Sequence, residues 1–173
     1  MASGGSLSMN RRIQRELETI AQADDSSAGV GVELKNSNDP TALTGYLNGP
    51  MDTPYEGGKF IVDIQIPKEY PFAPPKMKFR TKVWHPNISS QTGAICLDIL
   101  KDQWSPALTL KTALMSLSAL LSCPVPEDPQ DAEVASQYQR DYNAWKRRAR
   151  QWTQVSYTYM EKEFTLNYFD NCV

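Results

Sequence analysis

The first apolar residues of the chain recur at the spacing of an amphipathic helix. Ile13, Leu17 and Ile20 follow Asn10, a residue type that commonly caps helices, and the pattern ends at residues 24–29. The outer face of this predicted helix holds charged residues: Arg11, Arg12, Arg15, Glu16 and Glu18. Such charges usually form only a solvated face.

Four runs in which apolar and polar residues alternate come next. They begin at Val30, Leu43, Phe60 and Met77, and the fourth ends at Phe79. The segments between them are short and rich in turn-forming residues, and no helical pattern intervenes. Because parallel strands need long crossover connections, the pattern predicts an antiparallel meander.

Residues 81–105 show no periodicity, although Trp, His, Pro, Asn and Gly collect there. An irregular segment of this length in a compact domain usually carries function. Thr109 then caps an apolar helix over residues 110–122, which Cys123-Pro124 ends. Because apolar residues cover most sides of this helix, we expect it to be the central buried helix.

Two further helices are predicted over residues 131–139 and from Asp141 to about Tyr159. The second carries residues on one side that we expect in the core: Tyr142, Trp145, Ala149, Trp152 and Tyr159. The predicted fold class is α+β, a four-stranded antiparallel meander sheet flanked by an N-terminal helix, a central buried helix and two C-terminal helices.

Three segments divide the chain. Residues 1–8 are predicted to be flexible, residues 9–156 to form the core domain, and residues 157–173 to form an extension that could be helical. The extension carries four large apolar residues that we expect to pack on the domain or on a partner: Phe164, Leu166, Tyr168 and Phe169.

The composition limits the classes of function. At 173 residues the chain has room for one substantial domain, and its net charge of -2 argues against a broad basic surface for nucleic acid. No apolar run approaches the ~20 residues that span a bilayer, and the N-terminus lacks the features of a signal peptide. We therefore expect a cytoplasmic or nuclear protein that binds neither nucleic acid nor membrane.

The chain contains three cysteines, Cys96, Cys123 and Cys172, without a CxxC pair. Their number and spacing fit neither a disulfide framework nor a zinc site. With a single histidine and no clustered ligands, we predict no metal site and no cofactor.

The strongest chemical signal lies within the irregular segment, where His85-Pro86-Asn87 precedes Cys96. A cysteine sulfur can carry an acyl group where a donor stands ready for the oxyanion that forms when an amine attacks, and the Asn87 amide is the candidate donor. Gly93-Ala94 is expected to leave the approach to the sulfur uncrowded. The pattern therefore indicates thioester chemistry.

A cysteine with a histidine nearby could instead indicate a cysteine hydrolase. However, His85 and Cys96 lie in one local segment, whereas hydrolase histidines usually come from a distant element. We interpret His85 as a structural hydrogen-bonding residue that shapes the turn displaying Asn87. Cys123 and Cys172 lack comparable surroundings and are interpreted as structural or incidental.

Six motifs occur together and are most specific as a set. They are Gly49-Pro50 with Thr53-Pro54-Tyr55-Glu56-Gly57-Gly58; Tyr70-Pro71-Phe72-Ala73-Pro74-Pro75-Lys76; His85-Pro86-Asn87; Cys96-Leu97-Asp98-Ile99-Leu100; Gln103-Trp104-Ser105-Pro106-Ala107-Leu108-Thr109; and Glu127-Asp128-Pro129. Through them the chain resembles the ubiquitin-conjugating enzyme family, with residues 9–156 as the catalytic core. The flanks of Cys96 most resemble the branch that includes enzymes with a C-terminal ubiquitin-associated domain, for which this chain is too short.

The resemblance implies specific roles in ubiquitin transfer. Cys96 matches the residue that accepts the C-terminal carboxyl group of ubiquitin from the activating enzyme as a thioester. Asn87 matches the residue that stabilises the oxyanion or orders the neighbouring loop. Asp128 matches the acidic residue that positions the incoming lysine and favours its neutral form. Asp98 is a secondary candidate near the sulfur, for which a local cap or structural hydrogen bond is at least as good an interpretation.

The resemblance also implies partner surfaces. Two loops offered to RING-type and related ligases match Phe72, Pro106 and Ala107, and the first helix, shared by activating enzyme and ligase, holds Arg11, Arg12 and Arg15. The implied partners are ubiquitin, the activating enzyme and a RING-type or HECT-type ligase, and we expect a monomer.

Three other functions stay open: a variant that binds ubiquitin without carrying it, conjugation of another ubiquitin-like modifier, and cysteine hydrolysis. Cys96 and Asn87 argue against the first. The SUMO-conjugating branch typically carries a short insertion that is absent here, which argues against the second. Incubation with activating enzyme, ATP and candidate modifiers, followed by a non-reducing gel, would separate these functions.

Overall fold

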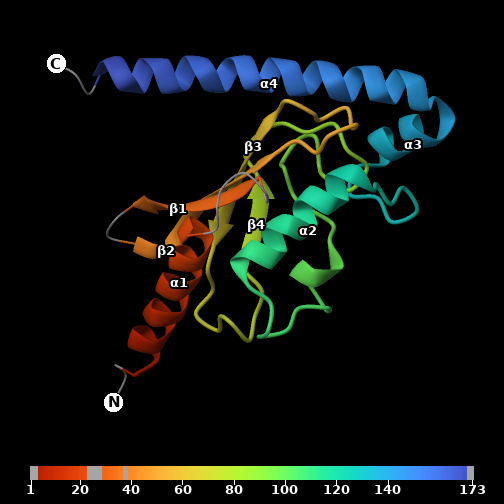
Figure 1. Cartoon of the computed structure of the whole chain (residues 1–173). Helices are drawn as coiled ribbons and strands as arrows, with labels where there is room; N and C mark the ends of the chain where they lie inside the picture. The colour runs from red at the N-terminus through yellow and green to blue at the C-terminus, as the bar shows by residue number, and fades with distance from the viewer. Residues whose placement is uncertain (1–3, 23–28, 37–38, 171–173) are drawn as a thin grey trace.

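The computed structural model describes the backbone of residues 4–22, 29–36 and 39–170, and the side chains of residues 11–22, 29–35 and 39–156. Within these ranges the strands β1 (Val30–Asn36), β2 (Asp39–Asn48), β3 (Lys59–Gln65) and β4 (Lys76–Phe79) form one antiparallel sheet. Their order in the sheet is β1-β2-β3-β4, so strands that are consecutive in sequence are neighbours in space (Figure 1). The predicted meander is confirmed.

The sheet has one buried face because side chains alternate along each strand. In the register of β2 and β3, Leu43 pairs with Ile64 and Leu47 pairs with Phe60. All four side chains are at most 2 % exposed. Gly45 and Val62 lie on the same buried side, whereas the alternate residues, such as Thr44 and Asp63, face the opposite, outward side of the sheet. The alternation seen in the sequence therefore separates the core face from the outward face.

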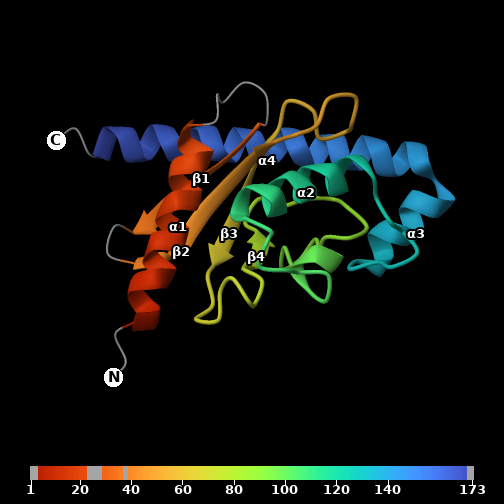
Figure 2. The ribbon, with the colours of Figure 1, turned by 60° about the horizontal axis from the view of Figure 1, so that its bottom comes forward.

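Helix α2 (Leu110–Ser122) packs on the buried face of the sheet, and Figure 2 shows it from a second side. Thr109 caps its first turn through a capping box with Thr112. A Cβ at Gly45 of β2 would lie 3.0 Å from the Leu114 side chain, so glycine allows the helix to approach the strand closely. Leu114 and Leu117 are fully buried. The predicted central buried helix is confirmed.

Helix α1 spans Gly4–Gln22 and therefore begins before the predicted cap at Asn10 and within the segment predicted to be flexible. Ile13 and Ile20 are buried, as the helical spacing predicts. The placement of Glu16 on the outer face is wrong, since this side chain is only 7 % exposed.

Glu16 joins three elements of the fold. Its carboxylate accepts a hydrogen bond from the Tyr70 hydroxyl at 2.7 Å and from the backbone N–H of Leu110, the first residue of α2, at 2.8 Å. It also forms an ion pair with Arg12. Burial, together with the bond to the Glu16 carboxylate, raises the pKa of Tyr70 well above its usual value. Glu16 thus fixes α1 against α2 and against the loop that follows β3.

Substitution of Glu16 by alanine is expected to lower the free energy of unfolding by about 2–4 kcal/mol, because two buried donors and the guanidinium of Arg12 lose their acceptor. For a domain of this size the melting temperature should fall by roughly 5–15 °C. Thermal unfolding followed by circular dichroism measures the change. Glu18→Ala, at an exposed position of the same helix, is the matched control. Equal melting temperatures for the two variants would contradict this role of Glu16.

Helices α3 (Ala132–Arg140) and α4 (Tyr142–Asp170) follow the predicted order, and Asp131, predicted as the first residue of α3, caps it instead. The α4 backbone continues beyond the predicted end near Tyr159 and runs along one side of the domain in both views (Figures 1 and 2). Trp145 and Ala149 are buried, as expected, but the expected core position of Tyr142 is wrong, since this side chain is 49 % exposed. The expected packing of the four apolar residues between 164 and 169 concerns side chains outside the described residues.

The described part of the chain has helices in residues 4–22, 110–122, 132–140 and 142–170. Among them, none is both long enough and apolar enough to cross a bilayer.

Candidate active site

The irregular segment docks on the edge strand β4 before the chain reaches Cys96. The backbone N–H of Phe79 donates to the carbonyl oxygen of Gly93 at 2.9 Å, and Ser89 N–H donates to the carbonyl of Ala94 at 2.8 Å. Gly93 has a φ of +75°, and a Cβ there would lie 1.9 Å from the Phe79 carbonyl oxygen. Only glycine fits this position. The structure thus gives a different reason for Gly93 than the predicted clearance of the sulfur.

His85 is fully buried, and both of its ring nitrogens are hydrogen-bonded. Nδ1 accepts from the backbone N–H of Asn87 at 3.0 Å, so the proton resides on Nε2, which donates to the Leu120 carbonyl oxygen at 2.9 Å. Burial lowers the pKa of His85 to about 4, against the opposing effect of the bond to Leu120. The neutral imidazole holds the turn before Asn87. Its nitrogens are occupied and do not serve as the base that a cysteine hydrolase requires.

We expect acidification to destabilise the protein through His85, its only histidine. The imidazole has a pKa near ~6.5 in an unfolded chain but about 4 in the fold. Because the folded value is depressed, the unfolded state binds the proton more readily, and stability falls as the pH drops from about 6.5 toward 4. The full loss is on the order of 3 kcal/mol.

Thermal melting at a series of pH values from roughly 7 to 4.5 measures this loss of stability. The variant His85→Gln should lose this part of the pH dependence, although it is less stable at neutral pH. An unchanged slope in the variant would show that other groups cause the acid sensitivity.

Asn87 is 2 % exposed and faces the loop that follows α2. Its Nδ2 donates to the carbonyl oxygens of Val125 at 2.8 Å and Asp128 at 2.9 Å, and its Oδ1 accepts from the backbone N–H of Val125 at 2.8 Å. Both amide hydrogens are therefore engaged by the loop. This geometry suits a residue that orders the loop, whereas donation to an oxyanion would need one of these bonds to open. The oxyanion role of Asn87 stays a prediction.

The same loop is fixed at its other end. The backbone N–H groups of Gln130 and Asp131 donate to the Pro86 carbonyl oxygen at 2.9 and 3.0 Å, and Ser90 N–H donates to the Asp131 carboxylate at 2.9 Å. Burial opposes the charged form of Asp131, but the hydrogen bonds from Ser90 and from the start of α3 outweigh it and lower its pKa. The segment after α2 is thus attached to the irregular segment at both ends.

Cys96 lies beside two charged side chains. Its Sγ is 3.5 Å from the Asp128 carboxylate and 3.4 Å from the Lys101 ammonium. Its backbone N–H donates to the carbonyl oxygen of Asn87 at 2.9 Å. The side chain is partly exposed. The structure therefore brings together three predicted residues, Cys96, Asn87 and Asp128.

Lys101 was missed by the sequence analysis. It follows the short 3-10 helix η1 (Asp98–Leu100), and its backbone N–H donates to the carbonyl oxygen of Asp98 at 2.9 Å. This turn returns the chain toward Cys96, which the sequence could not show because the segment lacks periodicity.

The structure does not bring every predicted residue to the sulfur. The Asp98 carboxylate accepts from the backbone N–H of Ile99 at 2.7 Å, which agrees with the structural interpretation of this residue. Cys123 is exposed at the C-terminal end of α2, and Cys172 lies outside the described residues. In the part of the chain that the structure describes, no group of three or more His, Cys, Asp or Glu side chains is arranged to hold a metal ion.

The residues predicted to contact a ligase gather where two loops meet. Phe72 is 81 % exposed, and Pro106 and Ala107 are exposed as well. The Trp104 indole N–H donates to the Pro71 carbonyl oxygen at 2.7 Å, which joins the two loops. The exposed side chains therefore belong to one surface.

The three arginines of α1 differ in their surroundings. Arg12 donates to the carbonyl oxygens of Pro106 at 3.0 Å and Leu108 at 3.1 Å, in addition to its ion pair with Glu16. Arg11 and Arg15 are exposed. Arg12 thus connects α1 to the second loop, while Arg11 and Arg15 present their side chains to solvent.

The family profile described as ubiquitin-conjugating enzyme matches residues 12–153. The chain is 63 % identical to ubiquitin-conjugating enzyme E2 27 of Arabidopsis thaliana over 144 residues, which are 83 % of this chain and 74 % of that protein. It is 53 % identical to ubiquitin-conjugating enzyme E2 K of Homo sapiens over 146 residues, which are 84 % of this chain and 72 % of that protein.

A solved structure shows the same fold. The E2 domain of a ubiquitin conjugating enzyme from Toxoplasma gondii matches with a TM-score of 0.80 and 52 % identity, over 85 % of this chain and 97 % of that chain. Fold and sequence together define an α+β transferase. The chain belongs to the ubiquitin-conjugating enzyme family. The predicted family, fold class and activity of ubiquitin conjugation are thereby confirmed at the level of the family.

Proposed function

We propose that Cys96 accepts the C-terminal carboxyl group of ubiquitin from the activating enzyme and passes it to a lysine amine. In the first step the Cys96 sulfur attacks the thioester carbonyl carbon, a new C–S bond forms, and the thiol of the activating enzyme leaves. In the second step a neutral amine attacks, a C–N bond forms, the C–S bond breaks, and Cys96 returns as a thiol. The observation that carries this proposal is the partly exposed Cys96 sulfur beside Asp128 and Lys101.

A ubiquitin adduct that forms with activating enzyme and ATP, and that a thiol reductant removes, tests the proposal. The absence of an adduct would favour a variant that only binds ubiquitin. An adduct that forms solely with another ubiquitin-like modifier would reject ubiquitin as the cargo.

Asp128 is the proposed positioning residue for the incoming lysine. Its exposed carboxylate lies 3.5 Å from the Cys96 sulfur, so an amine that contacts this carboxylate also stands next to the thioester carbon. A free lysine has a pKa of ~10.4 and is almost fully protonated at neutral pH. A group that aligns the amine and accepts its departing proton therefore assists the attack.

Substitution of Asp128 by alanine should slow lysine discharge most at neutral pH, and the defect should shrink as the pH rises, because a larger share of the lysine is then neutral without assistance. The loss of one general acid–base group typically costs ~100-fold or more. Single-turnover discharge from preloaded protein, measured from about pH 7 to 9.5, checks the effect. Glu127→Ala, an exposed carboxylate of the same loop, is the matched control. A defect that is independent of pH would reject this role.

The surface formed by Phe72, Pro106 and Ala107 is the proposed contact for a RING-type or HECT-type ligase. Phe72 is an exposed aromatic side chain on a loop that the Trp104 indole bond holds in place. A fixed aromatic anchor of this kind often dominates the energy of an interface. Arg11 and Arg15 on α1 extend this surface for the activating enzyme.

We propose a monomer that works in the cytoplasm or nucleus. Light scattering of the purified chain and fractionation of cells test these two points.

A further inference from the structure

Four basic side chains occupy alternate positions along the edge strand β4 and its continuation: Lys76, Lys78, Arg80 and Lys82. All four are exposed, and we refer to them as the basic row. Two of the residues between them are turned inward, since Phe79 is 3 % and Thr81 8 % exposed. Because side chains of a strand alternate between its faces, the basic row lies on the outward face of the sheet, away from α2.

The basic row is poorly compensated by acidic groups. In the described structure, the carboxylate that pairs with it is Asp63, which forms ion pairs with Arg80 and also with Lys35. The Lys82 ammonium donates to the carbonyl oxygens of Ser90 at 3.1 Å and Gln91 at 2.6 Å. These neutral acceptors fix the position of the ammonium group but do not neutralise its charge. An ordinary solvated surface mixes both signs of charge. Here Arg80 and Lys35 share the Asp63 carboxylate, and the other members of the basic row add positive charge beside them, although the whole chain has a net charge of -2.

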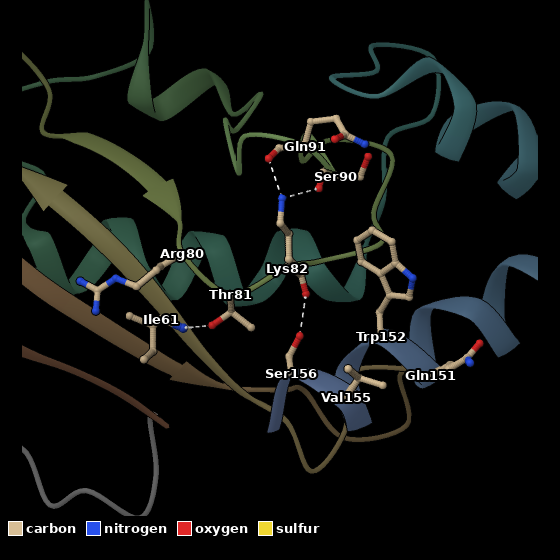
Figure 3. Close-up of a pocket in the computed structure, with 10 residues that line it drawn as sticks. All are labelled: Ile61, Arg80, Thr81, Lys82, Ser90, Gln91, Gln151, Trp152, Val155 and Ser156. Atoms are coloured by element: carbon tan, nitrogen blue, oxygen red, sulfur yellow. Dashed lines mark hydrogen bonds between the residues drawn. The ribbon is translucent and has the colours of Figure 1, made fainter. Parts of the chain in front are cut away.

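A cavity of about 700 Å³ lies at the end of the basic row, between the outward face of the sheet and α4 (Figure 3). Ile61, Trp152 and Val155 give it an apolar wall, and Val155 is 50 % exposed. Arg80 and Lys82 of the basic row also line it. Figure 3 shows Lys82 between Trp152 on α4 and the segment that holds Gln91.

The apolar wall of this cavity is held in place from behind. The Trp152 ring lies 4.9 Å from the Trp84 ring, measured between centroids, and the Arg148 guanidinium stacks 3.6 Å from the Trp84 ring centroid. The Ser156 hydroxyl donates to the Lys82 carbonyl oxygen at 3.2 Å and so joins α4 to the end of the basic row. Lysines on an edge strand commonly serve only to prevent pairing with other strands. That explanation does not account for an apolar cavity in contact with the same residues.

We propose that the basic row and this cavity bind an extended acidic peptide segment of a partner protein that carries one bulky apolar side chain. An extended peptide rises ~3.4 Å per residue, so acidic residues at alternate positions match the period of the basic row over about seven residues. The cavity receives the apolar side chain at the end where Lys82 stands. This site is separate from the sulfur of Cys96 and from the surface around Phe72, and the inference does not depend on the proposed role of either.

Fluorescence anisotropy of a labelled peptide tests the proposal directly, without ubiquitin. The probe is a ten-residue peptide with glutamate at alternate positions and one terminal tryptophan. Two control peptides replace every glutamate by glutamine, or the tryptophan by serine. We expect binding of the probe to weaken as the salt concentration rises. Each control peptide should bind with an affinity that is lower by roughly tenfold or more.

Variants of the protein assign the site. Lys76→Glu with Lys78→Glu should weaken binding by at least about tenfold, and Val155→Glu should abolish the preference for tryptophan over serine. Lys111→Glu on α2 and Met51→Glu in an exposed loop are the matched controls, and should bind like the unmodified chain. Melting temperatures establish that each variant is folded. If a variant is not folded, Lys78→Gln takes its place, because it removes a charge without reversing it.

Several results would overturn the inference. Equal binding of the glutamine peptide, an equal loss with Lys111→Glu, or no binding at millimolar peptide would each reject an acidic peptide at this site. Tighter binding of an oligothymidylate, or of vesicles that contain phosphatidylserine, would identify nucleic acid or membrane as the occupant instead.

Discussion

Replacement of Cys96 by alanine is expected to abolish the ubiquitin adduct completely, because the sulfur is the atom that bonds to the acyl carbon. The measurement is a non-reducing gel after incubation with activating enzyme, ATP and ubiquitin. The unmodified chain should give an adduct that reductant removes. Cys96→Ser should give an adduct that resists reductant, because an oxygen ester replaces the thioester.

Two controls make this result specific. Cys123→Ser, at an exposed cysteine next to α2, should load like the unmodified chain. Lys101→Arg removes the amine that stands 3.4 Å from the sulfur, so it shows whether any reductant-resistant product of the unmodified chain is an amide on Lys101. A full-strength, reductant-sensitive adduct that remains in Cys96→Ala would contradict the assignment.

Replacement of Asn87 by alanine should slow lysine discharge by ~100- to 1,000-fold if the amide supports the transition state. It should also lower the free energy of unfolding by about 1–3 kcal/mol, because three hydrogen bonds to the loop at Val125 and Asp128 are lost at a buried position. Loading should change much less, since the Cys96 sulfur stays in place. Single-turnover loading and discharge, together with thermal melting, measure the three effects.

The double variant Asn87→Ala with Asp128→Ala separates two explanations of a slow discharge. If Asn87 acts by holding Asp128 near the sulfur, the double variant should be little slower than the slower single variant. If Asn87 acts on the oxyanion itself, the two defects should multiply. Loading that slows as much as discharge would contradict both explanations and point to a general distortion of the site.

Local patterns were sufficient to predict the four strands and the central helix, but not the start of α1 or the end of α4. The alternation in β1 to β4 and the apolar helix capped by Thr109 depend on neighbours a few residues apart, and the structure confirms them. The burial of Glu16 was not predictable in this way, because its partners Tyr70 and Leu110 are 54 and 94 residues away in the sequence. A charged residue on a helix is usually solvated, and only the fold shows that this one is not.

The residues of the candidate site were predictable in part. Cys96, Asn87 and Asp128 were identified by residue type and by resemblance, and the structure brings them together. The hydrogen bonds that engage the Asn87 amide, and the turn that brings Lys101 near the Cys96 sulfur, lie inside a segment without periodicity. No sequence pattern could therefore reveal them. The sequence analysis did not identify the basic row, and the cavity beside it forms where α4 returns to this face of the sheet.

The most direct test of the central claim is to map the loaded cysteine in the unmodified chain. The protein is loaded with ubiquitin, digested with pepsin at acidic pH, where thioesters persist, and analysed by mass spectrometry. We predict that the C-terminal glycine of ubiquitin is bonded to the peptide that contains Cys96, and that Cys123 is recovered as a free thiol. Ubiquitin on a peptide that contains Cys123 or Cys172, with Cys96 free, would contradict the account.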